Sequence, residues 1–235
     1  KYLMSKDTFS IIITNYNNSK FIDRAIRSID NQQVSSNSAL TIETIIVDDG
    51  STDKTSELAK TYVEKPNTHY VYQENGGHAS ALNKGASIAK GKLLSFIDHD
   101  DLWEQTKLDI QVKALILDDE LDVVFSHQKS FAENKMAEKL TFERGSIPAY
   151  MPGSMLIRMN AFKKMGSFNT KIQKGYFLPW FDLLRIKGLK KLMLPDLHYH
   201  RRIHGGNLSI CSNAKDYKDY FLAISATRKQ RENGN

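Results

Sequence analysis

Residues 93–103 read LLSFIDHDDLW, and this stretch decides the fold. Leu93–Ile97 is a short apolar run of the kind that forms a buried strand. It leads directly into the polar group Asp98-His99-Asp100-Asp101, and a helix is predicted from about Trp103 to Leu117. A strand, a polar loop and a helix in this order form the repeating unit of a parallel sheet covered by helices.

The same unit occurs three times before this stretch. The predicted strands are Phe9–Thr14, Ile42–Val47 and His69–Tyr72. Each is followed by a predicted helix: the first begins after Ser19, and the other two are Asp53–Val63 and Ala79–Lys90. In the first helix the apolar residues recur at helical spacing: Phe21, Ile22, Ala25, Ile26 and Ile29. The sequence therefore predicts an α/β fold with a mostly parallel, Rossmann-like sheet flanked by helices.

The second half of the chain is less regular. Strands are expected at Val123–Ser126, at Met155–Arg158 and within Lys191–Ile203, and helices at Tyr176–Lys187 and Ala214–Arg231. No linker or repeat interrupts the sequence. We expect one domain over residues 1–235, with a nucleotide-binding half at about 9–126, a more variable half at about 127–208 and a C-terminal helix in 209–235.

Charge and cysteine content limit the classes of protein. The chain has 235 residues, and its 33 Lys and Arg exceed its 27 Asp and Glu to give a net charge of +6, which favours anionic partners. The basic residues are spread out, so a nucleic-acid-binding protein is not predicted. The single cysteine, Cys211, forms no internal disulfide, which favours a cytoplasmic protein.

Two features bear on membranes. No apolar stretch approaches the ~20 residues that a membrane-spanning helix needs. The basic segment Arg228-Lys229-Gln230-Arg231 is either a solvated helix end or a contact with an anionic membrane surface. A peripheral position at the inner face of the membrane is therefore one expectation for this chain.

The carboxylates after the strand at residues 93–97 are the first candidate site. Alternate side chains of a strand share a face, so Asp98 and Asp100 are expected to point at one centre. Carboxylates this close need a cation, and hard oxygen ligands suit Mg²⁺ or Mn²⁺. The alternative is that these acids cap the next helix, but capping does not account for three acids in four positions.

Two other strand ends carry polar residues, and in an open parallel sheet ligands bind beyond the carboxyl ends of the strands. Asp48 and Asp49 precede Gly50-Ser51, which indicates either a turn with a helix cap or an acceptor for the base or ribose of a nucleotide. Asn75-Gly76-Gly77 precedes a helix, and its N–H groups either face a phosphate or simply form a loop.

Several motifs together resemble glycosyltransferase family 2, whose members have the GT-A fold. They are FSIIITNYN at residues 9–17, IVDDGSTD at 46–53 and LSFIDHDDLW at 94–103. NGG at 75–77 with ALNKG at 81–85, PGSMLIR at 152–158 and RRIHGGN at 201–207 match later segments of the family. The resemblance covers the chain from Phe9 to about Leu208.

The resemblance implies transfer of a sugar from a nucleotide-diphosphate donor, UDP-linked by default, to a hydroxyl acceptor such as a saccharide, with inversion at the anomeric carbon. Thr14, Tyr16 and Asp48 match positions that hold the base and ribose, with Asp49 beside them. Asp98 and Asp100 match the DxD motif that meets the ribose and the metal-bound diphosphate. Asp101 and His204 match additional metal ligands, and Arg201 or Arg202 is placed near the diphosphate. His204 in a purely structural role is the alternative.

The catalytic base is where the chain departs from the family. Members often carry an acid just before the tryptophan of the helix that corresponds to residues 177–187, and this chain has Leu178-Pro179-Trp180. Asp182, about one helical turn further, is the candidate base, with a solvated acid as the alternative. A protein that binds the donor without transferring it is the second functional hypothesis. A nucleotidyltransferase is not expected, because Asn15-Tyr16-Asn17-Asn18 is not a glycine-rich loop.

Overall fold

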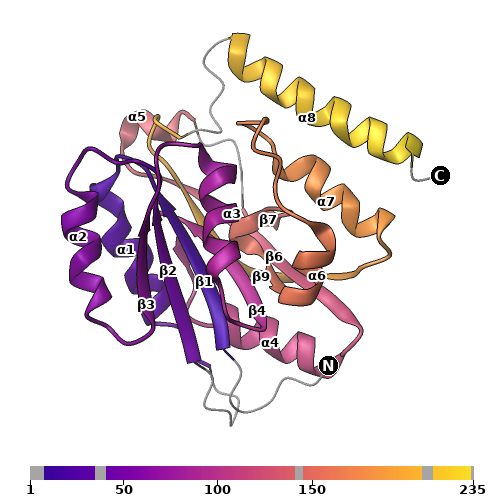
Figure 1. The fold of residues 1–235 in the computed structure, drawn as a ribbon, viewed down its shortest axis with the longest axis horizontal. Helices are drawn as coiled ribbons and strands as arrows, with labels where there is room; N and C mark the ends of the chain where they lie inside the picture. Colours follow the sequence, from indigo (N-terminus) through magenta and orange to yellow (C-terminus); the bar gives the residue numbers. More distant parts are fainter. Residues whose placement is uncertain (1–7, 35–40, 141–144, 208–213, 234–235) are drawn as a thin grey trace.

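The computed structural model describes residues 8–34, 41–140, 145–207 and 214–233 (Figure 1). Its first half alternates strands and helices as predicted. The elements are β1 (Thr8–Asn15), α1 (Ser19–Asp30), β2 (Thr41–Asp48), α2 (Thr55–Val63), β3 (Thr68–Tyr72), α3 (His78–Ile88) and β4 (Leu93–Asp98). Each predicted strand and helix of this half is present, with ends that differ from the prediction by a few residues.

The four strands of the first half are parallel and lie in the order β3-β2-β1-β4. In the central pairings Asn15 lies opposite Asp48, and Thr14 lies opposite Asp98. The polar residues that follow three separate apolar runs therefore meet at one edge of the sheet. This register positions the candidate site.

The second half extends the same sheet. Its elements are β5 (Leu102–Trp103), α4 (Lys107–Leu117), β6 (Leu121–Ala132), α5 (Lys135–Glu138), β7 (Ile147–Pro148), the 3₁₀ turn η1 (Pro152–Ser154), β8 (Leu156–Arg158), α6 (Met159–Met165), α7 (Phe177–Ile186), β9 (Lys190–Ile203) and α8 (Ala214–Asn233). Among the described residues the sheet has nine strands in the order β3-β2-β1-β4-β8-β6-β9-β5, and β7 pairs with β6. Antiparallel β8 joins the two halves. The predicted fold class is confirmed.

Two predicted boundaries in this half are wrong. The helix expected from Trp103 begins at Lys107, because Leu102 and Trp103 pair with His200 and Tyr199 as strand β5. The strand expected at Val123–Ser126 runs from Leu121 to Ala132. Its second half is polar or only partly buried, so it lacks the apolar run on which the prediction depended.

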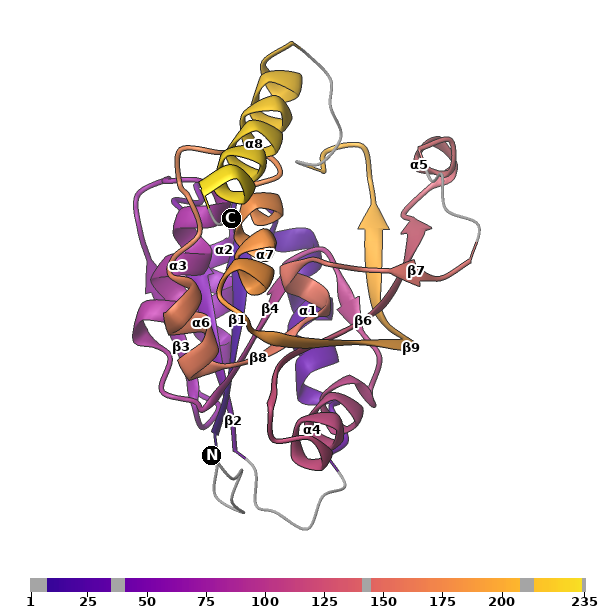
Figure 2. The same cartoon turned by 90° about the vertical axis from the view of Figure 1, so that its right-hand side faces the viewer.

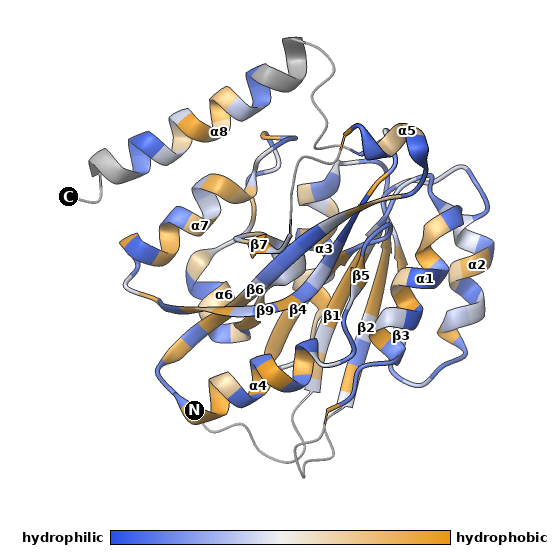
Figure 3. Ribbon diagram, turned by 180° about the vertical axis from the view of Figure 1, so that it is seen from behind, coloured by the Kyte–Doolittle hydropathy of each residue, from blue (hydrophilic) through white to orange (hydrophobic). Residues whose placement is uncertain are grey.

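Helices cover both faces of the sheet (Figure 2). One apolar core lies under α3, α6, α7 and α8, and the other lies under α1, α2 and α4. The central strands are hydrophobic along most of their length (Figure 3). Helix α8 packs on α7, and its Ala223 is fully buried in the first core. In the described part of the chain, no helix has both the length and the apolar character needed to cross a membrane.

Candidate active site

Three carboxylates gather where β4 ends. Asp98, Asp100 and Asp101 each offer an oxygen, and these oxygens lie within 4.8 Å of one another. Burial is the main cause that raises the pKa of Asp101 well above its usual value, and the charges of Asp100 and Asp98 add to it. A set of hard oxygen ligands with this much mutual repulsion fits a divalent cation such as Mg²⁺ or Mn²⁺. The predicted grouping of these acids is present.

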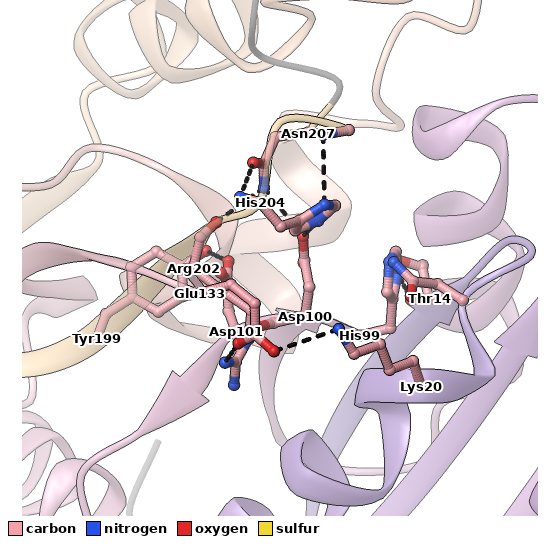
Figure 4. A network of polar contacts seen from close by, with 12 residues as sticks. Thr14, Lys20, His99, Asp100, Asp101, Glu133, Tyr199, Arg202, His204 and Asn207 are labelled. Carbon is pink, nitrogen blue, oxygen red and sulfur yellow. Dashed lines mark hydrogen bonds and ion pairs between the residues drawn. The ribbon is translucent and has the colours of Figure 1, made fainter. Parts of the chain in front are cut away.

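Residues 199–207, at the end of β9 and after it, contact the same acids (Figure 4). Oδ2 of Asp100 lies 3.0 Å from His204 Nε2 and accepts a hydrogen bond of 3.1 Å from Asn207 Nδ2. Burial alone would raise the pKa of Asp100. The His204 hydrogen bond and the charges of His99 and His204 outweigh that effect, so the pKa is lowered and the carboxylate form is stabilised. His204 thus lies beside the acid with which the sequence grouped it.

Asp101 uses both carboxylate oxygens within the protein. Oδ1 accepts a 2.7 Å hydrogen bond from the Arg202 backbone N–H, and Oδ2 accepts one from the Tyr199 hydroxyl. These bonds fasten β9 to the acidic motif. The contacts to His78 and to His204 and Asn207, in contrast, use one oxygen each of Asp98 and Asp100. Asp98 and Asp100 therefore have the better geometry for a metal ion.

Arg202 has partners other than the predicted diphosphate. Its guanidinium lies between the rings of Phe21 and Phe131, 4.8 and 4.6 Å from their centroids. Nε donates to the Asp100 backbone oxygen at 2.8 Å, and Nη1 donates to Glu133 Oε2 at 2.5 Å. The buried Arg202 thus fixes the backbone of the acidic motif. Arg201 is partly buried and, as its strand neighbour, points to the opposite face.

The predicted nucleotide residues lie at the ends of β1 and β2. Asp48 is buried and accepts hydrogen bonds from Ser51 N at 2.8 Å and from the Tyr70 hydroxyl at 2.7 Å. Thr14 is buried, and its backbone oxygen lies 3.1 Å from His99 Nδ1. Tyr16 is 49% exposed, so its ring is available to stack on a base.

Asp49 forms hydrogen bonds with the loop that precedes α3. It accepts hydrogen bonds of 2.9 Å from Gly76 N and from Gly77 N, and one of 2.6 Å from Gln73 Nε2. These two amides therefore point at a carboxylate of the protein, which favours the loop interpretation of Asn75-Gly76-Gly77 over the phosphate interpretation. Gly77 has φ +86°, a conformation that favours glycine.

Sequence reasoning missed His78 and Glu133. His78 Nε2 lies 2.9 Å from Asp98 Oδ1, and Glu133 pairs with Arg202 and Lys20. Burial, the largest single effect, lowers the pKa of His78, but the contact and charge of Asp98 together with the charges of Asp100 and Asp49 outweigh it and raise the pKa. The signal for His78 was its place directly after Gly76-Gly77 at the sheet edge. Glu133 directly follows β6, and the strand predicted there ended several residues too early, at Ser126. No local pattern therefore pointed to Glu133.

Asp182, the candidate base, lies on α7 with a side chain that is 7% exposed, and its Oδ1 is 4.0 Å from Arg185 Nε. Helix α7 is continuous from Phe177 to Ile186. Pro179 stands in its first turn, where the missing N–H removes no helical hydrogen bond. The residue before this helix, Tyr176, contacts His78 at 3.1 Å and so links α7 to the acidic site.

Relatives of the chain are glycosyltransferases. An uncharacterized glycosyltransferase of Rickettsia typhi (strain ATCC VR-144 / Wilmington) is 32% identical over 208 residues, which are 79% of this chain and 63% of that protein. Chondroitin synthase of Pasteurella multocida (strain Pm70) is 27% identical over 238 residues, 96% of this chain and 24% of that protein. The chain thus spans less than two thirds of the length of each of these two relatives.

A solved structure shares the fold. S. aureus TarS 1-349 in complex with UDP superposes with a TM-score of 0.71 at 20% identity, over 95% of this chain and 65% of that chain. The sequence profile of Glycosyl transferase family 2 matches residues 10–192, which contain the acidic motif, strands β2 to β4 and all but the first two residues of β1. With this match, the GT-A architecture and the acidic group at the end of β4, the chain belongs to glycosyltransferase family 2.

Proposed function

We propose that this protein transfers a sugar from a UDP-sugar to a hydroxyl group of a saccharide, with inversion at the anomeric carbon and with Mn²⁺ or Mg²⁺ as cofactor. The observation that carries the proposal is the group of Asp98, Asp100 and Asp101 joined to His204 at the end of parallel strands. The UDP complex of TarS supports the choice of nucleotide, and the chondroitin synthase relative supports a saccharide acceptor. Both halves of the chain contribute to this one site, so residues 1–235 act as a single catalytic domain.

Each part of the site has a role in this proposal. Thr14, Tyr16, Asp48 and Asp49 line the end that holds the base, and Asp98 meets the ribose. Asp100 and His204 would hold the divalent ion, Asp101 secures the motif to β9, and Arg202 supports the backbone of Asp100. A bound divalent ion would offset the negative charge that develops on the leaving diphosphate.

The acceptor side needs a base. The bond between the anomeric carbon and the diphosphate oxygen breaks while the acceptor oxygen attacks from the opposite side of the sugar ring. The acceptor hydroxyl loses its proton, and we assign that proton to the Asp182 carboxylate. Asp182 lies on α7. Tyr176, the residue directly before this helix, contacts His78, and His78 lies beside Asp98.

Calorimetric titration of UDP with and without Mn²⁺ or Mg²⁺, followed by a screen of UDP-sugars for release of UDP, tests the proposal. Metal-dependent binding with turnover is expected. Binding without turnover on any donor or acceptor would favour the second hypothesis, a nucleotide-sugar-binding protein without transfer activity, for which Pro179 in place of an acid is the motivating observation. No binding of UDP would contradict the donor assignment.

We further propose that the protein is cytoplasmic and that α8 contacts the inner face of the membrane. Phe221, Leu222 and Ile224 on α8 are 70%, 42% and 59% exposed. Lys218 and Lys229 are exposed on the same helix. Apolar side chains flanked by cations fit an anionic lipid surface.

The double substitution Phe221→Ser and Ile224→Ser should weaken binding to vesicles that contain phosphatidylglycerol by about 10-fold or more, because burial of one large apolar side chain contributes about 1.5–3 kcal/mol. Cosedimentation measures the effect. Leu117→Ser, which removes an 87% exposed leucine from α4, is the matched control and should leave vesicle binding unchanged. Equal binding of the double variant and the native protein would contradict a lipid contact through α8.

A further inference from the structure

His78 lies between the acidic motif and the beginning of α7. Its Nε2 is 2.9 Å from Asp98 Oδ1, and its Nδ1 is 3.1 Å from the Tyr176 hydroxyl oxygen. The two rings meet edge to face, with centroids 5.5 Å apart. The His78 side chain is 18% exposed and Tyr176 is buried. The His78 imidazole therefore connects Asp98 with Tyr176, the residue directly before α7, and α7 is the helix that carries Asp182.

The chemistry of the three groups sets the direction of the contacts. Tyr176 keeps its proton, because burial raises the pKa of its hydroxyl well above the usual value. Nε2 carries a proton both when Nδ1 accepts from the Tyr176 hydroxyl and when the ring is fully protonated, and it lies within ion-pair distance of Asp98 Oδ1 without the alignment of a hydrogen bond. The contact places one oxygen of Asp98 against His78 and so restrains the carboxylate.

The surroundings hold His78 itself in place. Asp49 bonds to the two amides directly before it, as described above. Five residues on, Asn83 exchanges two hydrogen bonds with the backbone of Phe168, at 2.8 and 2.9 Å. A Cβ on Gly77 would lie 2.2 Å from Gln173 Oε1, so the segment before α7 packs tightly on the start of α3. His78 is therefore part of a rigid junction between β2, α3, β4 and α7.

We propose that His78 is a positioning residue for the transfer reaction. It holds Asp98 in the orientation in which that carboxylate meets the donor, and through Tyr176 it fixes the start of α7 relative to the donor site. This inference rests on the proposed function, since the donor contact of Asp98 belongs to it. His78 acts through Asp98 and does not itself contact the reacting atoms.

The test compares His78→Ala with His78→Gln. The amide nitrogen of glutamine can bring an N–H group to Asp98 in place of Nε2, whereas alanine offers none. We expect His78→Ala to weaken binding of UDP in the presence of Mn²⁺ by about 10-fold or more, the usual effect of losing an outer partner of a metal site, and His78→Gln to recover most of the loss. Calorimetry with UDP and Mn²⁺, and kcat and KM with the active UDP-sugar, measure the effect.

His69→Ala is the matched control, because His69 also faces a carboxylate, Glu43, at 3.5 Å but lies on β3 away from the acidic motif. It should leave UDP binding unchanged. Unaltered UDP affinity in His78→Ala, or a loss in His78→Gln as large as in His78→Ala, would overturn the inference. A purely structural histidine would also give equal losses in those two variants.

Failure of the proposed function is recognised separately, by native protein that binds no UDP with any metal. The inference is then decided by thermal unfolding of His78→Ala, Asp98→Asn and the double variant without ligand. Non-additive shifts of the melting temperature support the contact between His78 and Asp98. Additive shifts overturn it.

Discussion

Replacement of Asp100 by Ala should abolish metal-dependent binding of UDP and reduce transfer by about 10²- to 10³-fold, the loss that follows removal of one group that stabilises charge in a transition state. Asp100 is 8% exposed, and one oxygen of its carboxylate, Oδ2, contacts both His204 Nε2 and Asn207 Nδ2. The alanine removes both the ligand and the group that orients His204. Titration of UDP with and without Mn²⁺, together with release of UDP from the active sugar donor, measures the effect.

Asp109→Ala is the matched control for this substitution. Asp109 is also 8% exposed, and it pairs with Lys113 at 2.7 Å on α4, outside the acidic motif. It should change stability without changing metal-dependent binding. Circular dichroism on both variants shows whether a loss of binding comes from unfolding or from damage to the site alone. Metal-dependent binding that survives in Asp100→Ala would refute the assignment of Asp100 as a ligand.

Asp182→Asn should lower kcat by about 10²- to 10⁴-fold, the usual contribution of a general base, while the affinity for UDP and Mn²⁺ stays unchanged. The substitution keeps the shape of a side chain that is 7% exposed and removes only its capacity to accept a proton. Single-turnover measurements with a UDP-sugar and acceptor give the rate, and calorimetry gives the affinity. The separation between the two is what identifies a base.

Asp109→Asn serves as the control here, because Asp109 is likewise a buried helical acid with a cation on the same helix face. It should leave kcat near the native value, since Asp109 pairs with Lys113 on α4, outside the acidic motif. Native-like turnover in Asp182→Asn would place the base elsewhere. A fall in UDP affinity equal to the fall in rate would assign Asp182 to donor binding.

Most of the first half of the fold could be predicted, because three of its four strands are largely buried and read as short apolar runs between loops. The strand β1 illustrates this: seven of its eight residues are buried. β5 could not be predicted, since it has two residues and its partners are Tyr199 and His200, almost a hundred residues away. No local pattern encodes a pairing of that kind.

The position of the site could also be predicted, but the tasks of individual residues could not. Residue type and spacing placed Asp48, Asp98 and Asp100 at strand ends, and the register brings Asp48 and Asp98 to the two sides of β1. Residue type does not say whether a charge faces a ligand or the protein. Asp49 and Arg202 carry the expected charges, but Asp49 accepts from Gly76 N and Arg202 donates to Glu133. These partners are distant in the sequence, and only the packing of the folded chain brings them close.

Folding brings the two parts of the site together late. Asp101 bonds to a residue 101 positions further along the chain, and Asp100 to one 107 positions further. These contacts depend on β9, which pairs in parallel with β6 across a separation of about 70 residues, and such non-local pairing is slow to form. During synthesis the carboxylates leave the ribosome well before Tyr199, His204 and Asn207. A nascent chain that has already closed β1 to β4 therefore has the acids but has not yet assembled the proposed nucleotide-sugar site.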